Sequence, residues 1–354
     1  MENKLKNMGW VLHDLKIYFP LLILTNEEVK VKMTLKELID IFLEYKKKRV
    51  KDSTFYLYNF LKKYLLDYFD EKIEIKTLNT MQIQFFLDNI CSKHKHTTNI
   101  SIFNFLKSLL YFAENFGFLD ENKIKIKKIE LISKRKTIED LINDRNKKNI
   151  IYTLSDLDAI FAKIKKVKFE EKFIFYFGLQ TGMRIGEILA LTWNDINFSD
   201  NTIEITKNYL KNVKILDTPK TLSSVRKIYI SDDIKEEFKK IKKIQNQNKF
   251  KYGKEYIKEY RNNKEVDYIF RKENGEQITY NTLLNTIKKI KRVDKNFHFH
   301  KLRHSFCSQY IQQGVDVLHI AKIMGHASVN TTLKIYTHIK NEEIIHIMQK
   351  TKIM

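Results

Sequence analysis

The stretch HKLRHSF, from His300 to Phe306, combines residue types that can bind a phosphodiester. It places Arg303 between two histidines in a chain where only nine of the 65 basic residues are arginine. On a helix, His300 and Arg303 are three positions apart and share a face, and His304 can lie near it. A guanidinium binds two phosphate oxygens at once, whereas a lysine ammonium cannot. The choice of arginine here therefore indicates a phosphate site.

A second arginine, Arg184, lies in the stretch TGMRIGEILAL. Thr181 and Gly182 are predicted to end one helix, and Arg184 stands where the next begins. The free N–H groups of a helix N-terminus favour a bound anion, and a guanidinium adds further donors. Taken alone, Arg184 is more simply interpreted as a surface residue at a helix start.

Near the C-terminus, the stretch IMGHASVNTTLKIYTH holds a histidine and a tyrosine that could act together. Gly325 is predicted to end a helix, and His326 follows at a sharp corner. Tyr336 comes ten residues later, on the predicted next helix. The apolar stripe expected on the helix before the corner includes Val315, Leu318 and Ile323.

A lysine, Lys220, follows Pro219 in the stretch TPKTLSSVRK, where a strand is expected to turn. The fixed φ of proline would stiffen that approach. A lysine at a hairpin tip can reach into a cleft, but alone it is more simply a solvated side chain.

The elements that would position these residues fall into two parts. Four amphipathic helices are predicted between Thr34 and Phe118, with Thr34 as the first N-cap and Ser53 capping the second helix. Gly117 is expected to end the fourth. A highly charged stretch, residues 120–149, follows and is interpreted as a linker, with one short helix expected at residues 137–144.

The second part is predicted to begin with a helix capped by Thr153 and to stay helical through Leu191. Residues 198–208 and 213–231 then alternate like strands. From Asp232 onward the pattern is helical again. The sequence therefore predicts a mainly α protein, with one small antiparallel sheet in its second part.

The formal net charge of +22 and the isoelectric point of about 9.6 indicate a polyanionic partner, with nucleic acid first. The alternative is that heavy lysine usage reflects an AT-biased genome. Cys91 and Cys307 match no metal spacing and fit a reduced cytoplasmic interior. The apolar run at residues 17–24 is too short to span a bilayer, so no membrane partner is expected.

Together the motifs resemble the tyrosine recombinase (phage integrase) family. Its signature is an arginine in a TG-x-R-x-x-E setting, a hairpin lysine, H-x-x-R, G-H and a tyrosine nucleophile. All of these occur here in family order, at the catalytic positions Arg184, Lys220, His300, Arg303, His326 and Tyr336. The resemblance covers about residue 153 to the C-terminus, and the helical N-terminal part looks like the family's core-binding domain.

The resemblance implies a two-domain clamp around double-stranded DNA. The expected parts are an N-terminal extension (1–33), a helical, SAM-like core-binding domain (34–125), a charged linker (126–152) and a catalytic domain with a C-terminal tail helix (153–354). The two arginines would hold the scissile phosphate, and Glu187 would support Arg184. Tyr336 would attack the phosphorus while Lys220 and His300 transfer protons. No metal, nucleotide or other cofactor is implied.

By the same resemblance, the protein would act as a homotetramer on two DNA sites, with the tail helix exchanged between subunits. Lack of an obvious arm-binding domain favours a Xer-type recombinase that resolves chromosome dimers at a dif-type site, similar to the single Xer proteins of some epsilon-proteobacteria. Its setting would be the bacterial cytoplasm and nucleoid, with a cell-division DNA translocase as a candidate partner. The main alternative is the integrase of a phage or mobile element. Remoter ones are a type IB topoisomerase and a non-catalytic DNA-binding protein.

Overall fold

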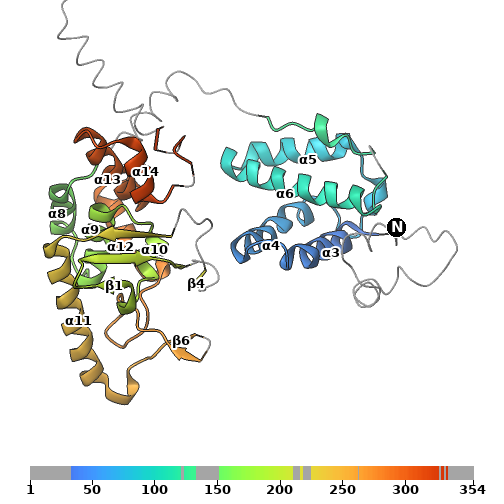
Figure 1. Ribbon diagram of the computed structural model, residues 1–354. Coiled ribbons are helices and arrows are strands. Elements are labelled where there is room, and N and C mark those ends of the chain that lie inside the picture. The colour runs from blue at the N-terminus through green and yellow to red at the C-terminus, as the bar shows by residue number, and fades with distance from the viewer. Residues whose placement is uncertain are drawn as a thin grey trace, which may run out of the picture. The chain divides into compact units, whose positions relative to one another are not determined.

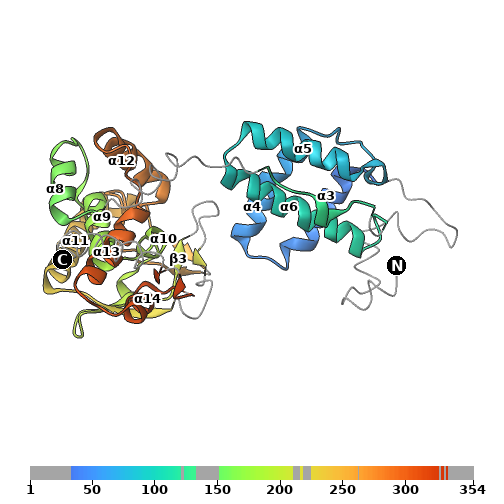
Figure 2. The same ribbon diagram turned by 90° about the horizontal axis from the view of Figure 1, so that it is seen from above.

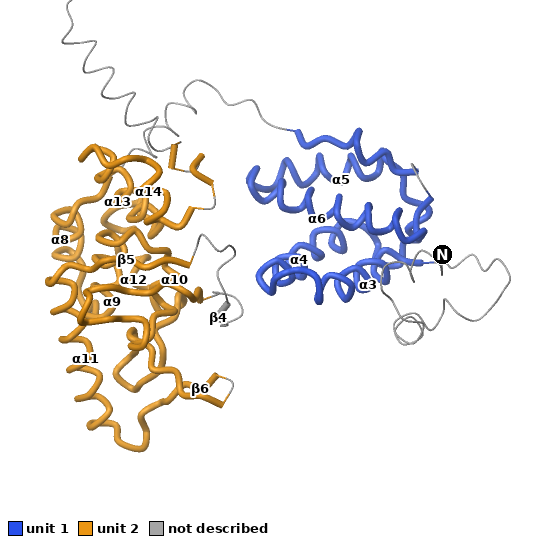
Figure 3. The backbone as a smooth tube through the Cα atoms, viewed as in Figure 1, with its two compact units in different colours: residues 1–136 blue, residues 137–354 orange. Residues whose placement is uncertain are grey.

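The computed structural model describes residues 33–120, 123–132, 151–209, 216–217, 225–261, 263–326, 328–330 and 332–333. The chain divides into two compact units, residues 1–136 and 137–354 (Figure 3). The fold is mainly helical, which confirms the predicted class. In the part of the chain that is described, no helix is long and apolar enough to cross a membrane.

Four α-helices build the described part of the first unit (Figure 1): α3 (Leu35–Lys47), α4 (Asp52–Leu66), α5 (Thr80–Lys93) and α6 (His96–Asn115). Thr34 caps α3 as predicted, since its hydroxyl accepts from the N–H of Glu37. Ser53 does not cap α4, because the helix already begins at Asp52 and Lys51 is its N-cap. Gly117, at φ 73°, follows the end of α6 in the left-handed region that favours glycine.

The core of the first unit is rich in aromatic rings. The ring of Phe42 on α3 lies 5.9 Å from that of Phe105 and 5.4 Å from that of Phe112, both on α6. Two short 3₁₀ helices, η1 (Ile75–Thr77) and η2 (Ile126–Lys128), also lie in the described part of this unit. Ile126 and Ile129, which fall in the segment interpreted as a linker, are buried in this core.

The helices of the second unit surround α9 (Phe169–Thr181). This helix contacts α8 (Leu154–Ala162), α10 (Ile185–Leu189), α11 (Asp232–Tyr252) and α13 (His300–Gln312). Figures 1 and 2 show α9 near the middle of the unit. Among the described residues, the other helices of this unit are α12 (Tyr280–Val293), α14 (Val317–Met324), η3 (Trp193–Asp195) and η5 (Gly253–Glu255).

A three-stranded antiparallel sheet packs beside these helices in the order β1-β2-β5. Its strands are β1 (Ile196–Asn197), β2 (Thr202–Ile205) and β5 (Arg226–Tyr229). Two further antiparallel ladders join β3 (Asn208–Tyr209) to β4 (Leu216–Asp217), and β6 (Tyr260–Arg261) to β7 (Lys264–Glu265). The predicted single sheet is thus accompanied by two short ladders.

The β6–β7 ladder contradicts the expectation of continuous helix after Asp232. A buried arginine explains this, because the side chain of Arg271, 2% exposed, donates to backbone carbonyls of the surrounding loop. The acceptors are the carbonyls of Ile257, Val266, Tyr268 and Gly275. Carbonyls bound in this way need no helical partner.

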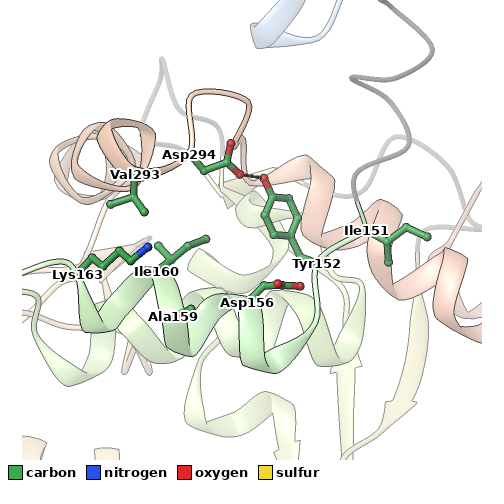
Figure 4. Close-up of a pocket in the computed structure, with 8 residues that line it drawn as sticks. All are labelled: Ile151, Tyr152, Asp156, Ala159, Ile160, Lys163, Val293 and Asp294. Atoms are coloured by element: carbon green, nitrogen blue, oxygen red, sulfur yellow. Dashed lines mark hydrogen bonds between the residues drawn. The ribbon is translucent and has the colours of Figure 1, made fainter.

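Tyr152 anchors the start of the second unit to α13. Its N–H donates to the Ser305 hydroxyl at 2.7 Å, and its carbonyl accepts from the Gln309 side chain at 2.8 Å. Its own hydroxyl bonds the carboxylate of Asp294, which caps α12 (Figure 4). The entering chain is therefore fixed directly to the helix that carries His300 and Arg303.

Candidate active site

Arg303 lies inside the second unit, with 1% of its surface exposed. Its Nη1 donates to the carbonyl of Gly182 at 2.6 Å, and its Nη2 donates to the carbonyl of Met324. These carbonyls end α9 and α14, where the last carbonyls of a helix lack partners within it. One guanidinium therefore joins two helix ends, while Leu302 and Phe306 face the core as predicted.

Arg184 is the N-cap of α10, which confirms its predicted place at a helix start. Its Nη1 pairs with Glu187 at 2.7 Å, and its Nη2 donates to the carbonyl of Gly325 at 3.2 Å. The Arg184 side chain is 37% exposed, far more than that of Arg303. The N–H of Arg184 donates to Glu187 at 2.9 Å, so the anion beside this N–H is the chain's own carboxylate.

A third arginine, Arg226 at the start of β5, completes this cluster. Its Nη2 lies 2.9 Å from Glu187 Oε2 and its Nη1 lies 3.2 Å from Oε1. Its Nε donates to the carbonyl of Ile323 at 2.6 Å. Burial alone would raise the pKa of Glu187, but the hydrogen bond and charge of Arg226, with the charge of Arg184, hold that pKa below its ordinary value.

The three arginines thus bind three successive carbonyls at the end of α14. Arg226 binds Ile323, Arg303 binds Met324 and Arg184 binds Gly325. Gly325 adopts φ 63°, the left-handed conformation that ends α14 as predicted. His326 follows at once, so its backbone position depends on all three guanidinia.

The stripe predicted for α14 is wrong at Leu318, which is 62% exposed. Asp316 caps this helix and accepts from the N–H of Leu318. The residues of α14 that face the interior are Ile320, Ala321 and Met324.

Two histidines stand beside the arginines. Burial, with the charges of Arg303 and Arg184, lowers the pKa of His326 to about 4. Burial, followed by His304 and Arg303, lowers the pKa of His300 to about 4. Both imidazoles are therefore neutral at pH 7, and the rings of His300 and His304 lie 4.6 Å apart. A neutral imidazole can accept a proton or donate a hydrogen bond.

Thr332 orients His326, since its hydroxyl lies 2.7 Å from Nδ1 of the imidazole. Nε2 is then the nitrogen that a phosphate oxygen would contact. Thr332 and Arg226 were not among the residues predicted from sequence. For Arg226, its rarity as an arginine in a lysine-rich chain was a usable signal. Thr332 carried none.

Burial and the charge of Arg184 lower the pKa of Arg303 to about 9, so Arg303 remains charged at pH 7. Several cations held together in a buried place favour a bound anion. The structure therefore brings Arg184, His300, Arg303, His326 and the supporting Glu187 into one positively charged site. Lys220 and Tyr336 lie outside the described residues.

A hollow of about 300 Å³ lies elsewhere, between α8 and the end of α12 (Figure 4). Ile151, Tyr152, Ile160 and Asp294 are among the residues that line it, and none of the predicted site residues does so. We place the candidate site at the arginine cluster, because two of the charged residues that line the hollow, Asp156 and Asp294, are carboxylates that would repel an anion.

Comparisons with known proteins show which family the chain resembles. Residues 151–343 match the phage integrase family, and residues 34–90 match the N-terminal SAM-like domain of phage integrases. A tyrosine recombinase XerC-like protein of Caldanaerobacter subterraneus is 29% identical over 287 residues, 75% of this chain and 69% of the relative. Transposase A from transposon Tn554 of Staphylococcus aureus is 30% identical over 282 residues, 77% of this chain and 68% of the relative.

The fold is also that of solved integrases. A Tn1549 transposon integrase in complex with transposon right end DNA matches with a TM-score of 0.65 at 19% identity, over 89% of this chain and 100% of that one. A lambda integrase dimer bound to a COC′ core site matches with a TM-score of 0.57 at 16% identity, over 86% of this chain and 95% of that one. The family match spans more than half of the chain, and with the arginine–histidine site it places this protein in the phage integrase family of tyrosine recombinases.

Proposed function

We propose that this protein cleaves and rejoins DNA at a specific site through a 3′-phosphotyrosine at Tyr336. The observation that carries the proposal is the meeting of Arg184, Arg303 and His326 at the end of α14, although they come from distant parts of the sequence. Rigid donors aimed at one place stabilise charge that develops during a reaction.

In this proposal the two arginines and His326 bind the non-bridging oxygens of the scissile phosphate. Glu187 holds Arg184 in place through their ion pair of 2.7 Å. Charge builds on those oxygens when a nucleophile adds to the phosphorus, so the arginines bind the transition state more tightly than the ground state.

The protons move through two other side chains. His300, neutral at pH 7, accepts the proton of the Tyr336 hydroxyl as the oxygen attacks phosphorus. The bond between phosphorus and the 5′-oxygen breaks, and Lys220 gives that oxygen a proton. Religation reverses these steps, and the phosphotyrosine conserves the energy of the broken bond.

The test is covalent trapping of the protein on DNA. Wild type should form an SDS-resistant adduct, and Tyr336→Phe should bind DNA equally well but form none. Adducts that persist in Tyr336→Phe would remove Tyr336 from the mechanism. No adduct with wild type would favour the non-catalytic DNA-binding protein, and relaxation of supercoils by a monomer would favour the topoisomerase.

We further propose that the two units divide the work. The helical unit, residues 34–125, would bind the duplex through its basic surface, and residues 153–354 would hold the phosphate. Residues 126–152 would connect them, with Ile126 and Ile129 at the start of this segment packed into the core of the first unit. Support comes from the net charge of +22 and from the DNA present with the Tn1549 and lambda integrases.

Two biological roles fit this activity. Resolution of chromosome dimers at a dif-type site, with a cell-division translocase as partner, is supported by the XerC-like relative. Integration and excision of a mobile element is supported by relatives named as the Tn554 transposase and a Lactococcus lactis prophage integrase. Sequencing the genomic DNA joined to wild-type protein separates the two. A single chromosomal site indicates the first role, and the ends of an element indicate the second.

We also propose assembly as a homotetramer through the C-terminal tail, residues 341–351, docked on a neighbouring subunit. Ile344, Ile345, Ile347 and Met348 recur there at helical spacing. Such a short helix is marginal alone and needs a surface on which to bury this stripe. Deleting the residues after Lys340 should leave half-site binding intact and abolish cooperative binding to the full site. Unchanged cooperativity on gel shifts would instead mean that the tail packs on its own domain.

A further inference from the structure

Arg226 takes no part in the reaction proposed above, although its side chain lies within the arginine cluster. Its side chain is 7% exposed, and two of its nitrogens bind the two oxygens of Glu187. Its third nitrogen binds the carbonyl of Ile323, three residues before His326. A bidentate pair with this geometry is held far more rigidly than a surface ion pair.

The charges of the clustered groups indicate the role of Arg226. Arg184, Arg226 and Arg303 are positive, Glu187 is negative because its pKa is held low, and His300 and His326 are neutral. The net charge of these groups is therefore +2. A phosphodiester carries one negative charge, and addition of the Tyr336 oxygen brings a second to the phosphoryl oxygens. The proton of Tyr336 moves to His300, so the second negative charge develops on the oxygens that Arg184 and Arg303 bind, and these guanidinia bind the transition state more tightly than the bound DNA.

We propose that Arg226 is a positioning residue that neutralises Glu187 and so leaves the full charge of Arg184 and Arg303 to the scissile phosphate. Without Arg226, the Glu187 carboxylate would be paired with Arg184 alone. The net charge of the cluster would then fall to +1. The end of α14 would also lose one of its three guanidinium anchors. This inference rests on the proposed function, because it assigns a role within that reaction.

A charge-balancing role and a purely structural role of Arg226 predict different ways of restoring activity. If Arg226 only stabilises the fold, every substitution should harm the protein equally on all substrates. If it balances charge, then neutralising Glu187 should compensate for its loss, since Arg184 and Arg303 alone then give +2. A substrate that requires one positive charge fewer should likewise be less sensitive to its loss.

The experiment compares Arg226→Met, Arg226→Lys and the double variant Glu187→Gln with Arg226→Met. The readout is the single-turnover rate of adduct formation on a duplex carrying the mapped site. A second duplex has a methylphosphonate at the scissile position, which removes one negative charge. Arg292→Met is the matched control, because Arg292 is exposed on the last turn of α12. Circular dichroism melts confirm that each variant is folded.

Arg226→Met should slow adduct formation on the ordinary duplex by about a hundredfold with unchanged DNA affinity. Arg226→Lys should lose less, and the double variant should recover at least about tenfold. On the methylphosphonate the defect of Arg226→Met should shrink to a few-fold. If Arg226→Met cannot fold, the double variant still tests the idea, because it removes the buried carboxylate that would otherwise be paired with Arg184 alone.

A double variant no faster than Arg226→Met, or equal defects on both duplexes, would overturn the charge-balancing role. So would an Arg226→Met protein as fast as wild type. Failure of the proposed function looks different, since wild type would then form no adduct on either duplex and both ideas would fall.

Discussion

The two units place their positive charge differently. In the described part of the first unit no lysine is buried, and basic side chains such as Lys36 and Lys47 are more than half exposed. In the second unit, Arg226 and Arg303 are 7% and 1% exposed and donate to backbone carbonyls. Exposed lysines provide an attraction that tolerates movement, whereas buried guanidinia fix geometry. We therefore expect the first set to control affinity and the second to control rate.

The largest expected effect is at Arg303. Both Arg303→Met and Arg303→Lys should reduce the rate of adduct formation by about a thousandfold, because lysine cannot bind the carbonyls of Gly182 and Met324 together. Single-turnover kinetics at saturating DNA measure this rate, and gel shifts provide the affinity. A wild-type rate in Arg303→Lys would show that charge alone suffices, and the comparison would fail.

Lys220 tests the comparison between lysines and arginines from another side, because it is a lysine that we propose as a proton donor in the reaction. Lys220→Ala should slow cleavage by about a hundredfold or more, since the leaving 5′-oxygen then lacks its proton. A duplex with sulfur at the 5′-bridging position should restore cleavage, because a thiolate leaves without a proton. Arg184→Ala on the same duplex is the control and should not be rescued. Equal rescue of both variants would undo the assignment.

In the first unit, the salt dependence of DNA binding should show that exposed lysines control DNA affinity and not the cleavage rate. Lys47, Lys48 and Lys51 are exposed near the α3–α4 connection. Changing all three to Gln should weaken binding and reduce the slope of log affinity against log salt by about one for each lysine that contacts a phosphate. The cleavage rate at saturating DNA should not change. A flat salt dependence in wild type would mean that the basic composition does not serve DNA binding.

The smallest effect concerns stability and pH. The ordinary histidine pKa is 6.5, and in the folded protein those of His300 and His326 are about 4. Between these values the unfolded chain binds more protons, so stability should fall as the pH falls from about 6.5 to about 4. Below that range these histidines cause no further loss.

Thermal melts between pH 4 and pH 8 measure this dependence, and His300→Gln and His326→Gln should each flatten it. His319→Gln is the matched control, because that side chain is 76% exposed and outside the cluster. An unchanged pH profile in both cluster variants would show that the buried histidines are not coupled to stability.

Local signals in the sequence predicted the places of Arg184 and Gly325 correctly. A helix start and a left-handed glycine depend on neighbouring residues, so short motifs reveal them. The same logic found Thr153, whose hydroxyl accepts from the N–H of Asp156. It failed at Ser53, because α4 begins two residues earlier than a cap at Ser53 would place its start.

Contacts between distant residues could not be predicted in this way. Arg226 is 39 residues from Glu187 and 97 from Ile323, and no periodic pattern links them. The β6–β7 ladder was missed for a similar reason, because the carbonyls that Arg271 binds belong to a loop without helical or strand periodicity. In a lysine-rich sequence the rare arginines do indicate such contacts, because lysine is the usual basic residue of this chain.

The three carbonyls at the end of α14 also restrict how the gene can change. One residue inserted into or deleted from this helix turns its end by about 100° and moves it by about 1.5 Å. Ile323, Met324 and Gly325 would then no longer face Arg226, Arg303 and Arg184. We therefore expect single-residue insertions and deletions to be excluded between Val317 and Gly325, even at the exposed Leu318, where many substitutions should be harmless. Among functional descendants of this chain, the length of α14 should vary less than its sequence.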